Sequence, residues 1–254
     1  MKIKILRTKE PIFSYDILDD KTIYFTKKGE IFLNYEIIRT EKIVCSNDVL
    51  IRFIDSETFL VIDRDTINKK NAFLFNIQGK LIRSIQIGDV LDCLIIKKKI
   101  IVSYSECLID SSNEIERNRF VVFDLNGNLL YKYSSKDVYE VKSFLRINSE
   151  KIQILCYTGS NEKSLILDFC LNQLEVISKK WIYFNNKNLN YPNSFINFEN
   201  SLIFSQIDHD NFKTCFYKVE NKKCTKIKEI NLEHSQRIKG INEIGFIGME
   251  ISKF

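Results

Sequence analysis

Glycine and proline, the usual turn residues, are scarce in this sequence. Among 254 residues there are only 8 glycines and 2 prolines. Most turns must therefore be formed by Asn, Asp, Lys and Ser, and Asn and Asp can do so because they tolerate left-handed backbone. Histidine is also rare, with only His209 and His234, and a zinc site usually needs histidine together with closely spaced cysteines.

Paired cysteines are missing as well. The chain has seven cysteines, an odd number, and none of them forms a C-x-x-C pair. Most lie in apolar runs such as "IQILCYT", where a free thiol acts as a small apolar side chain. We therefore predict reduced, buried thiols, no metal and no cofactor. We also predict a cytoplasmic location, because disulfides are typical of oxidising compartments.

Long apolar stretches and one-sided charge are absent too. No run approaches the roughly 18 apolar residues of a membrane helix, and "MKIKILRTKEPIF" lacks the apolar core of a signal peptide. The 38 Lys and Arg are interspersed with 33 Asp and Glu, which gives a net charge of +5. Nucleic-acid binding is not favoured without a clustered basic tract, and we expect no membrane association.

What the sequence has in abundance is apolar and aromatic residues. Apolar residues make up 44% of the chain, and 19 Phe and 11 Tyr are among them. This composition is sufficient for a sizeable core and is typical of β-strands. No window shows a long apolar repeat of helical period. The sequence therefore predicts an all-β protein with almost no helix.

One sequence pattern recurs five times. A phenylalanine ends an apolar run, a polar turn follows, and an alternating apolar run comes after it, as in "FNIQGKLIR" and "FDLNGNLLY". The turn contains glycine in the first three copies. The copies begin at Phe25, Phe75, Phe123, Phe169 and Phe216, at intervals of 50, 48, 46 and 47 residues. Periods of about 40 to 50 residues are typical of propeller blades.

Each repeat has room for four short strands. Residues 48–87, for example, contain "VLIRFI", "FLVID", "NAFLFNI" and "KLIRSIQI", separated by polar turns. The recurring pattern is then the turn between the third and fourth strands, where Gly79 or Gly127 adopts the positive φ of a tight hairpin. Four-stranded antiparallel sheets bury their faces against one another around an axis. We therefore predict a single β-propeller domain over residues 1–254.

The number of blades depends on how the two ends of the chain are used. The runs "IKGINEI" and "GFIGMEI" predict two strands of a blade that N-terminal strands must complete. In the favoured arrangement "KTIYF" and "EIFLNYEI" complete it, and five blades are closed by N- and C-terminal strands. In the alternative, "KIKIL" seals a sixth blade and residues 12–46 form a blade of their own.

The pattern resembles bacterial β-propeller repeat proteins of the WD40-like and NHL-like kind over nearly the whole chain. The Trp-Asp and Gly-His dipeptides of WD40 repeats are missing. A local likeness to uncharacterised bacterial propeller-like proteins is carried by Gly88, Asp89, Asp92 and Tyr104. The resemblance implies a fold and no particular activity, because propellers host many functions.

Polar residues at the ends of the predicted innermost strands are candidates for a site in a central channel. They are Asp48, Asp89, Asp92, Glu140, Lys142, Asn193 and Lys239. Two carboxylates at a suitable separation, or several around a cation, could serve a hydrolase or lyase. This enzyme is the alternative hypothesis. Asp208 and Asp210 in "IDHDNF" are interpreted as part of a polar hairpin rather than a cation site.

Residues 179–200 predict a binding surface. This segment contains the only tryptophan, Trp181, together with Tyr183, Tyr191, Asn186 and Lys187. We interpret it as a long loop, and long loops on a rigid scaffold often carry recognition. Aromatic residues mixed with Asn and Lys are typical of adaptable binding surfaces. A second polar loop, "ECLIDSSNEIERNR", could lie on the same face or on the opposite one.

The leading functional hypothesis is a non-enzymatic, monomeric propeller that binds another protein. The sequence contains no nucleophile elbow, phosphate loop, dinucleotide fingerprint or zinc-protease motif. A small propeller without such motifs would suit an immunity-type, inhibitor or scaffold protein.

Overall fold

The computed structural model consists of β-strands joined by turns over the residues that it describes. These are residues 2–8, 11–41, 48–64, 69–105, 113–184, 189, 191–199, 201–208, 213–220, 223–231, 236–242 and 245–251. Residues 2–7, 236–242 and 245–251 are described by their backbone alone. The described residues form no helix, which confirms the all-β prediction. Among them, therefore, no helix is long and apolar enough to span a membrane.

The strands belong to two compact units, which we describe separately. The continuous unit is Glu10–Ser134, and the discontinuous unit combines Met1–Lys9 with Ser135–Phe254. The prediction of one domain over residues 1–254 stays a prediction.

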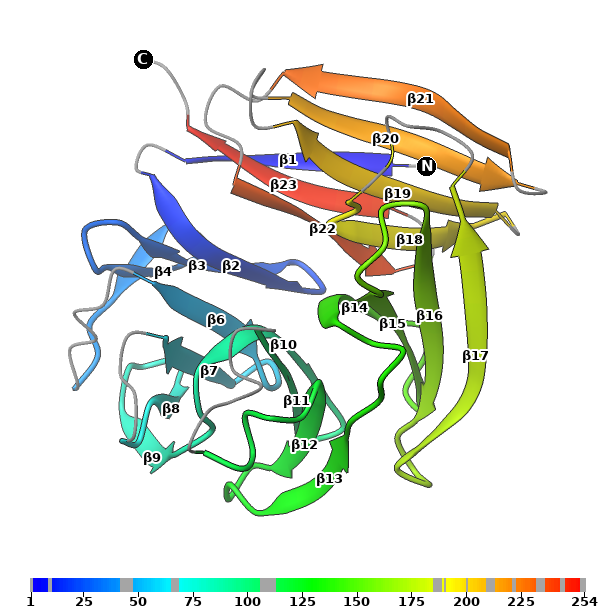
Figure 1. Ribbon diagram of the computed structural model, residues 1–254. Helices are drawn as coiled ribbons and strands as arrows, with labels where there is room; N and C mark the ends of the chain where they lie inside the picture. The colour runs from blue at the N-terminus through cyan, green and yellow to red at the C-terminus, as the bar shows by residue number, and fades with distance from the viewer. Residues whose placement is uncertain are drawn as a thin grey trace. The chain divides into compact units, whose positions relative to one another are not determined.

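The continuous unit holds three four-stranded sheets, each with antiparallel neighbours in chain order (Figure 1). The first sheet contains β2 (Ile12–Leu18), β3 (Lys21–Thr26), β4 (Ile31–Leu33) and β5 (Glu36–Ile38). The second contains β6 (Val49–Phe53), β7 (Thr58–Asp63), β8 (Ala72–Asn76) and β9 (Leu81–Ile85). The third contains β10 (Val90–Ile96), β11 (Lys99–Tyr104), β12 (Phe120–Asp124) and β13 (Leu129–Tyr133).

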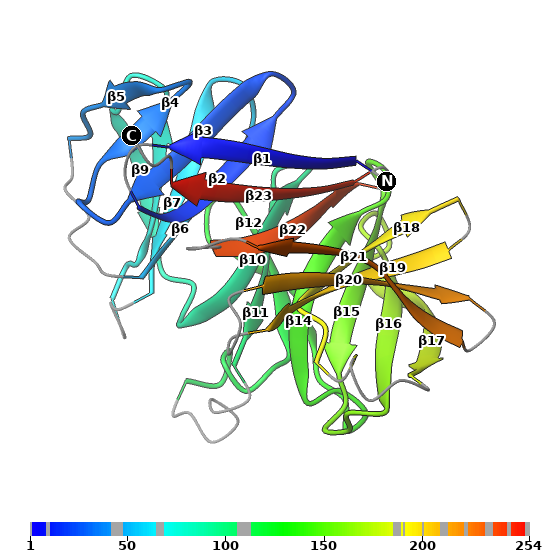
Figure 2. The same ribbon diagram turned by 90° about the horizontal axis from the view of Figure 1, so that it is seen from above.

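The discontinuous unit holds two further sheets of the same kind and one smaller sheet. The first four-stranded sheet contains β14 (Glu140–Arg146), β15 (Lys151–Tyr157), β16 (Lys163–Cys170) and β17 (Glu175–Tyr183). The second contains β18 (Ser194–Phe198), β19 (Ser201–Asp208), β20 (Lys213–Glu220) and β21 (Lys223–Asn231). The three-stranded sheet has the order β1 (Lys2–Thr8), β23 (Gly245–Ile251) and β22 (Gln236–Asn242). Figure 2 shows β1 beside β23, and the two strands are parallel.

Five sheets therefore have the four-stranded antiparallel order of a propeller blade, which confirms the predicted β-propeller class and its five four-stranded blades. The first and last strands share one sheet, as predicted. However, the N-terminal strand that completes this sheet is β1 ("KIKILRT"), and not "KTIYF" or "EIFLNYEI". The favoured assignment of these strands is therefore wrong, and the strands follow the alternative, in which "KIKIL" completes the last sheet and the residues from 12 onward form a sheet of their own. The physical reason is that β2 pairs with β3 and so completes a four-stranded sheet within residues 12–38. The strands "KTIYF" and "EIFLNYEI" therefore belong to that sheet.

The recurring sequence pattern forms the turn between β8 and β9, as predicted. Asn76 Oδ1 accepts hydrogen bonds from the N–H groups of Gln78 at 3.1 Å and Lys80 at 2.9 Å. Gly79 has a φ of 84°, and a Cβ at this position would lie 2.1 Å from the backbone oxygen of Arg39. Both the positive φ and the nearby backbone exclude a side chain, so the turn requires glycine. The turn between β12 and β13 repeats this geometry, with a glycine at a φ of 86°.

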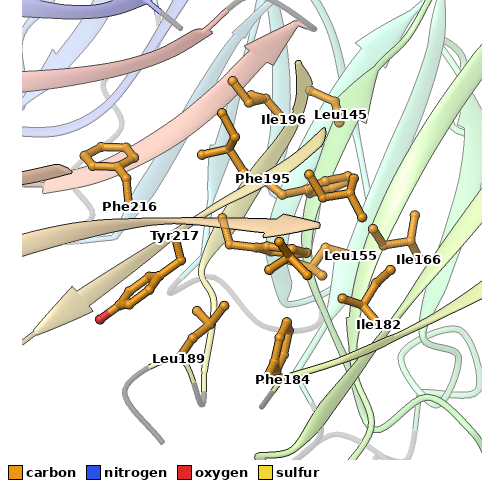
Figure 3. Packing of buried hydrophobic residues seen from close by; sticks show 14 of the residues in the cluster. Leu145, Leu155, Ile166, Ile182, Phe184, Leu189, Phe195, Ile196, Phe216 and Tyr217 are labelled. Carbon is orange, nitrogen blue, oxygen red and sulfur yellow. The ribbon is translucent and has the colours of Figure 1, made fainter. Parts of the chain in front are cut away.

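Large apolar side chains fill the space between neighbouring sheets. In the discontinuous unit, one face of the β14–β17 sheet packs on the β18–β21 sheet (Figure 3). The labelled contributors from these strands are Leu145, Leu155, Ile166, Ile182, Phe195, Ile196, Phe216 and Tyr217. Phe184 and Leu189, which follow β17, belong to the same core. Removal of this apolar surface from water is the main contribution that stabilises the packed sheets.

The cysteines of the described residues are free thiols, as predicted. Cys93, Cys156 and Cys215 are buried, and Cys170 and Cys224 are half-buried. Burial raises the pKa of the Cys156 thiol, so this group stays neutral and acts as an apolar side chain. The other two cysteines, Cys45 and Cys107, lie outside the described residues.

Candidate functional site

Trp181 and Tyr183 lie on a strand, and not in a long loop as predicted. β17 continues to Tyr183 and is the outermost strand of its sheet, so the connection to β18 begins only at Phe184. The reason is strand pairing. Trp181 is the register partner of Leu165 in β16, and Tyr183 is the partner of Lys163.

The two aromatic side chains are exposed beside two lysines. Trp181 is 36% exposed and Tyr183 is 48% exposed. Lys163 Nζ lies 4.6 Å from the centroid of the Trp181 ring, which is a cation–π contact. Lys179 is on the same face of β17 as Trp181, because alternate residues of a strand share a face, and its Nζ is 3.7 Å from Asp137 Oδ2. We call Lys163, Lys179, Trp181 and Tyr183 the β17 surface.

Tyr191, from the same predicted segment, belongs to a different group of residues. Its hydroxyl donates a hydrogen bond to Glu140 Oε2 at 3.1 Å. Lys142 Nζ donates to both the Glu140 carboxylate and the Tyr191 hydroxyl. The Tyr191 ring meets the Tyr157 ring edge-on, with centroids 4.9 Å apart. Because the Glu140 side chain is only 8% exposed, its charge is balanced by Lys142 rather than by water.

These two groups lie on opposite faces of the β14–β17 sheet. Tyr157 pairs with Ser164, and Ser164 pairs with Ile182, so all three side chains point to one face. Trp181 is the neighbour of Ile182 in the chain, so its side chain points to the other face. The structure therefore separates Trp181 and Tyr183 from Tyr191, although the sequence segment had suggested one surface.

The central-channel candidates are divided between the two units. Asp48, Asp89 and Asp92 belong to the continuous unit, and Glu140, Lys142, Asn193 and Lys239 belong to the discontinuous unit. Within the discontinuous unit, Glu140 and Lys142 form the ion pair described above. Asn193 Oδ1 accepts a hydrogen bond from the N–H of Ile207 at 2.8 Å. Lys239 is described by its backbone alone, and Asn186 and Lys187 lie outside the described residues.

Asp48 and Asp89 have partners in nearby loops. Asp48 Oδ1 accepts a hydrogen bond from Arg64 Nη1 at 2.9 Å. The backbone N–H of Asp89 donates to Glu116 Oε1 at 3.0 Å. Gly88 packs closely on the same carboxylate, because a Cβ there would lie 2.7 Å from Glu116 Oε1. Glu116 belongs to the described part, residues 113–119, of the second polar loop of the sequence, and its carboxylate links this part to the start of β10.

Asp92 is the partner of a buried arginine that the sequence analysis missed. Arg52 Nη2 donates to Asp92 Oδ1 at 2.9 Å, and Arg52 Nε donates to the carbonyl oxygen of Cys93 at 2.7 Å. Arg52 Nη1 donates to the carbonyl oxygen of Ile51 at 2.7 Å and to Ser14 Oγ at 3.2 Å. These contacts join the first strands of the three sheets of the continuous unit, β2, β6 and β10.

Electrostatics keeps this arginine charged. Burial by itself would lower the pKa of Arg52, but the carboxylates of Asp92 and Asp16 raise the pKa above its ordinary value. The sequence signal was a single arginine inside the apolar run "VLIRFI". Arginine is almost never fully buried without a partner, so this position required one.

Tyr104, one of the residues that carry the local resemblance, also has a structural role. Its hydroxyl donates a hydrogen bond to the carbonyl oxygen of Ile87 at 2.6 Å. Burial, followed by the nearby carboxylate of Glu116, raises the pKa of Tyr104 well above its usual value. The phenol therefore stays protonated and holds the connection between β9 and β10.

The described residues contain no group of three or more His, Cys, Asp or Glu side chains that could hold a metal ion. Asp208 ends β19, while His209 and Asp210 lie outside these residues.

Comparisons with known proteins establish the fold. No protein-family model matches the chain, and no curated protein matches it. Similar solved structures include the following three. Hydrazine synthase of Kuenenia stuttgartiensis has a TM-score of 0.59 at 12% identity, covering 87% of this chain and 67% of that chain. The Cps50 (Swd1) β-propeller domain of Myceliophteria thermophila has a TM-score of 0.52 at 8% identity. The match covers 88% of this chain and 73% of that chain. BBS1N, crystallised in complex with ARL6DN, has a TM-score of 0.51 at 11% identity. The match covers 89% of this chain and 66% of that chain. At such identities the likeness shows the β-propeller fold alone.

Proposed function

We propose that this protein is a non-enzymatic module that binds another protein through the β17 surface. The observation that carries the proposal is the exposed pair of Trp181 and Tyr183, flanked by Lys163 and Lys179. Tryptophan and tyrosine are enriched where binding energy is concentrated in protein interfaces. The fold supports the proposal, because propellers of this class fit a binding role. Among the structural neighbours, BBS1N was crystallised in complex with ARL6DN.

The surroundings of Trp181 make it suited to contact with a partner. Its backbone is paired with β16 and the Lys163 ammonium lies over one face of its ring, so less side-chain entropy is lost on binding. The amphipathic rings of tryptophan and tyrosine supply large contact areas while keeping a polar group for hydrogen bonding. Such a rigid surface is what an inhibitor, an immunity-type protein or a scaffold needs, and we propose a role of this kind for a monomer in the cytoplasm.

The alternative, a hydrolase or lyase, has one observation in its favour. Glu140, Lys142 and Tyr191 bring a carboxylate, an ammonium and a phenol together. In this group the two charges neutralise each other and the carboxylate is buried. We therefore rank it below the β17 surface and use it as the control site in the experiment.

The test is capture of a partner from the cell extract of the source organism by the tagged protein. We expect one stoichiometric protein that the Trp181→Ala/Tyr183→Ala variant no longer captures. The matched control is Tyr35→Ala/Ile37→Ala, which removes side chains of 62% and 55% exposure from another part of the surface and should leave capture unchanged. A partner that all variants retain would contradict the proposal. A partner lost only with Glu140→Gln would direct attention to the buried ion pair.

A further inference from the structure

We propose that β17 binds an extended, acidic segment of the partner protein, which adds to the sheet as a fifth strand. This inference rests on the proposed function and specifies how the partner is recognised. In strand addition, backbone hydrogen bonds supply affinity and alternate side chains supply specificity.

The length of β17 is the first observation. The outer strands of the continuous unit, β5, β9 and β13, have 3, 5 and 5 residues. β17 and β21 have 9 residues each and end their sheets in the same way. Figure 1 shows β17 at the outer end of its sheet. A long outer strand presents a row of backbone N–H and C=O groups to another chain, and proteins usually keep such strands short.

The side chains of β17 show what kind of segment would fit. All residues of the strand except Val176 and Ile182 are exposed. Lys179 and Trp181 point to one face and Lys180 to the other. An added strand in which every second residue is Glu places its carboxylates on one face and its apolar side chains on the other. With the carboxylates on the Trp181 face, they can meet Lys179 and Lys163 beside the Trp181 ring. The only acidic residue of β17 is Glu175, at its start.

The two lysines of the β17 surface, Lys163 on β16 and Lys179 on β17, are available for a partner. Lys163 makes its described contact with the Trp181 ring rather than with a carboxylate. Lys179 is paired with Asp137 at 3.7 Å, and both side chains are about half exposed. Exposed pairs of this kind contribute little to stability, so a partner carboxylate can replace Asp137 at small cost.

β21 is a natural control, because it has the same length and a different charge arrangement. Lys213 and Lys226 both contact the carboxylate of Glu229, and Lys218 contacts Glu220 at 2.8 Å. Lys226 is thus paired with a carboxylate of its own strand, and the paired Lys213 and Lys218 belong to the neighbouring strand β20. Among its exposed residues β21 has Ile227 and no aromatic side chain. If length alone determined strand addition, β21 would bind the same segment as β17.

The experiment uses a fluorescent nine-residue peptide of alternating Glu and Val, and three comparison probes. The first is the same peptide with every internal nitrogen methylated, which keeps the carboxylates but cannot donate strand hydrogen bonds. The second replaces Glu by Lys, and the third is a poly-uridine RNA. Binding to the full-length protein is measured by fluorescence anisotropy, and amide hydrogen exchange by NMR locates the site.

We expect the Glu/Val peptide to bind and to protect amides in β17 but not in β21. Methylation should weaken binding by about 100-fold, because several net hydrogen bonds are lost. The Lys163→Glu/Lys179→Glu variant should reduce binding at least about tenfold, whereas Lys218→Glu/Lys226→Glu should not. A peptide that does not bind, equal binding after methylation, equal protection of β21, or RNA as the preferred ligand would each overturn the inference.

Failure of this inference and failure of the proposed function are distinguishable. If the extract yields a partner that depends on Trp181 and Tyr183 while the peptide experiment fails, the binding module stands and strand addition is wrong. If the partner is insensitive to these two residues, the proposed function itself fails.

Discussion

The guanidinium of Arg52 lies 2.9 Å from the carboxylate of Asp92, and this contact joins β6 to β10 across two sheets. Both side chains are buried, so if one charge is removed, water cannot hydrate the charge that remains. We expect Arg52→Met to lower the free energy of unfolding by about 3 to 5 kcal/mol, the usual cost of breaking a buried ion pair from one side. Urea unfolding of the variant measures this change.

The double variant Arg52→Met/Asp92→Leu is the control for this prediction. It replaces the pair by apolar side chains and should recover part of the lost stability, because no buried charge is left without its partner. A double variant less stable than Arg52→Met would show that the arginine acts mainly through its bonds to backbone carbonyl groups.

Gly79 is expected to be less replaceable than Gly159. Both have positive φ, so alanine strains either position by about 1 to 2 kcal/mol. A Cβ at Gly79 would lie 2.1 Å from the Arg39 backbone oxygen, whereas at Gly159 the nearest atom is 3.8 Å away, on the flexible Tyr139 side chain. Thermal unfolding should show a larger loss for Gly79→Ala than for Gly159→Ala. Equal losses would mean that the segment around Arg39 moves away freely.

Asp168 is expected to make the free energy of unfolding depend on pH in the acid range. Burial opposes its ionisation, but hydrogen bonds from Ser178, Gln153 and Lys151 outweigh burial and lower the pKa of Asp168. Because the pKa of Asp168 is lower in the folded state, its carboxylate stabilises the fold when the pH is above the ordinary pKa of about 4. This stabilisation is lost as the pH falls through the folded-state pKa. Asp168→Asn should therefore be less stable than the native protein at neutral pH, and the difference should shrink below about pH 4. Chemical unfolding over this pH range checks the sign, and a constant difference would contradict it.

The Tyr191 hydroxyl is expected to matter for stability although the side chain is exposed, at 38% against 48% for Tyr183. The Tyr191 hydroxyl donates to the buried Glu140 carboxylate at 3.1 Å, so its removal should cost about 1 to 3 kcal/mol of stability. The matched variant Tyr183→Phe changes an exposed side chain of β17 and should have nearly the native stability. Similar losses in both variants, measured by urea unfolding, would contradict this assignment.

The repeat predicted the sheets well because strand length, turn glycines and apolar alternation are local properties. The favoured arrangement left out β2, which only the alternative included, because the apolar pattern of this strand is broken by polar residues. Asp16 accepts a hydrogen bond from the backbone N–H of Phe53 at 2.8 Å, so a neighbouring strand makes this polar residue acceptable. The sequence around residue 16 does not indicate that Phe53 is the partner of Asp16.

The candidate site was predicted less well than the fold. Outer strands resemble loops in composition because both are exposed, and Trp181 was therefore placed in a loop rather than on β17. The pairing of Asp92 with Arg52 spans 40 residues of chain, and residue spacing cannot show such a contact. The division of Trp181 and Tyr191 between two faces follows from strand register, which a single sequence does not fix.

The parallel pairing of β1 with β23 has a consequence for biosynthesis. Lys2 and its register partner Gly245 are separated by 243 residues. At synthesis rates of about 5 to 20 residues per second, β1 waits for its partner on the order of tens of seconds after it leaves the ribosome. The continuous unit can form its three sheets during that interval, since all of their strands lie between residues 12 and 133. β1 is thus paired later in synthesis than the strands of the continuous unit that follow it in the sequence.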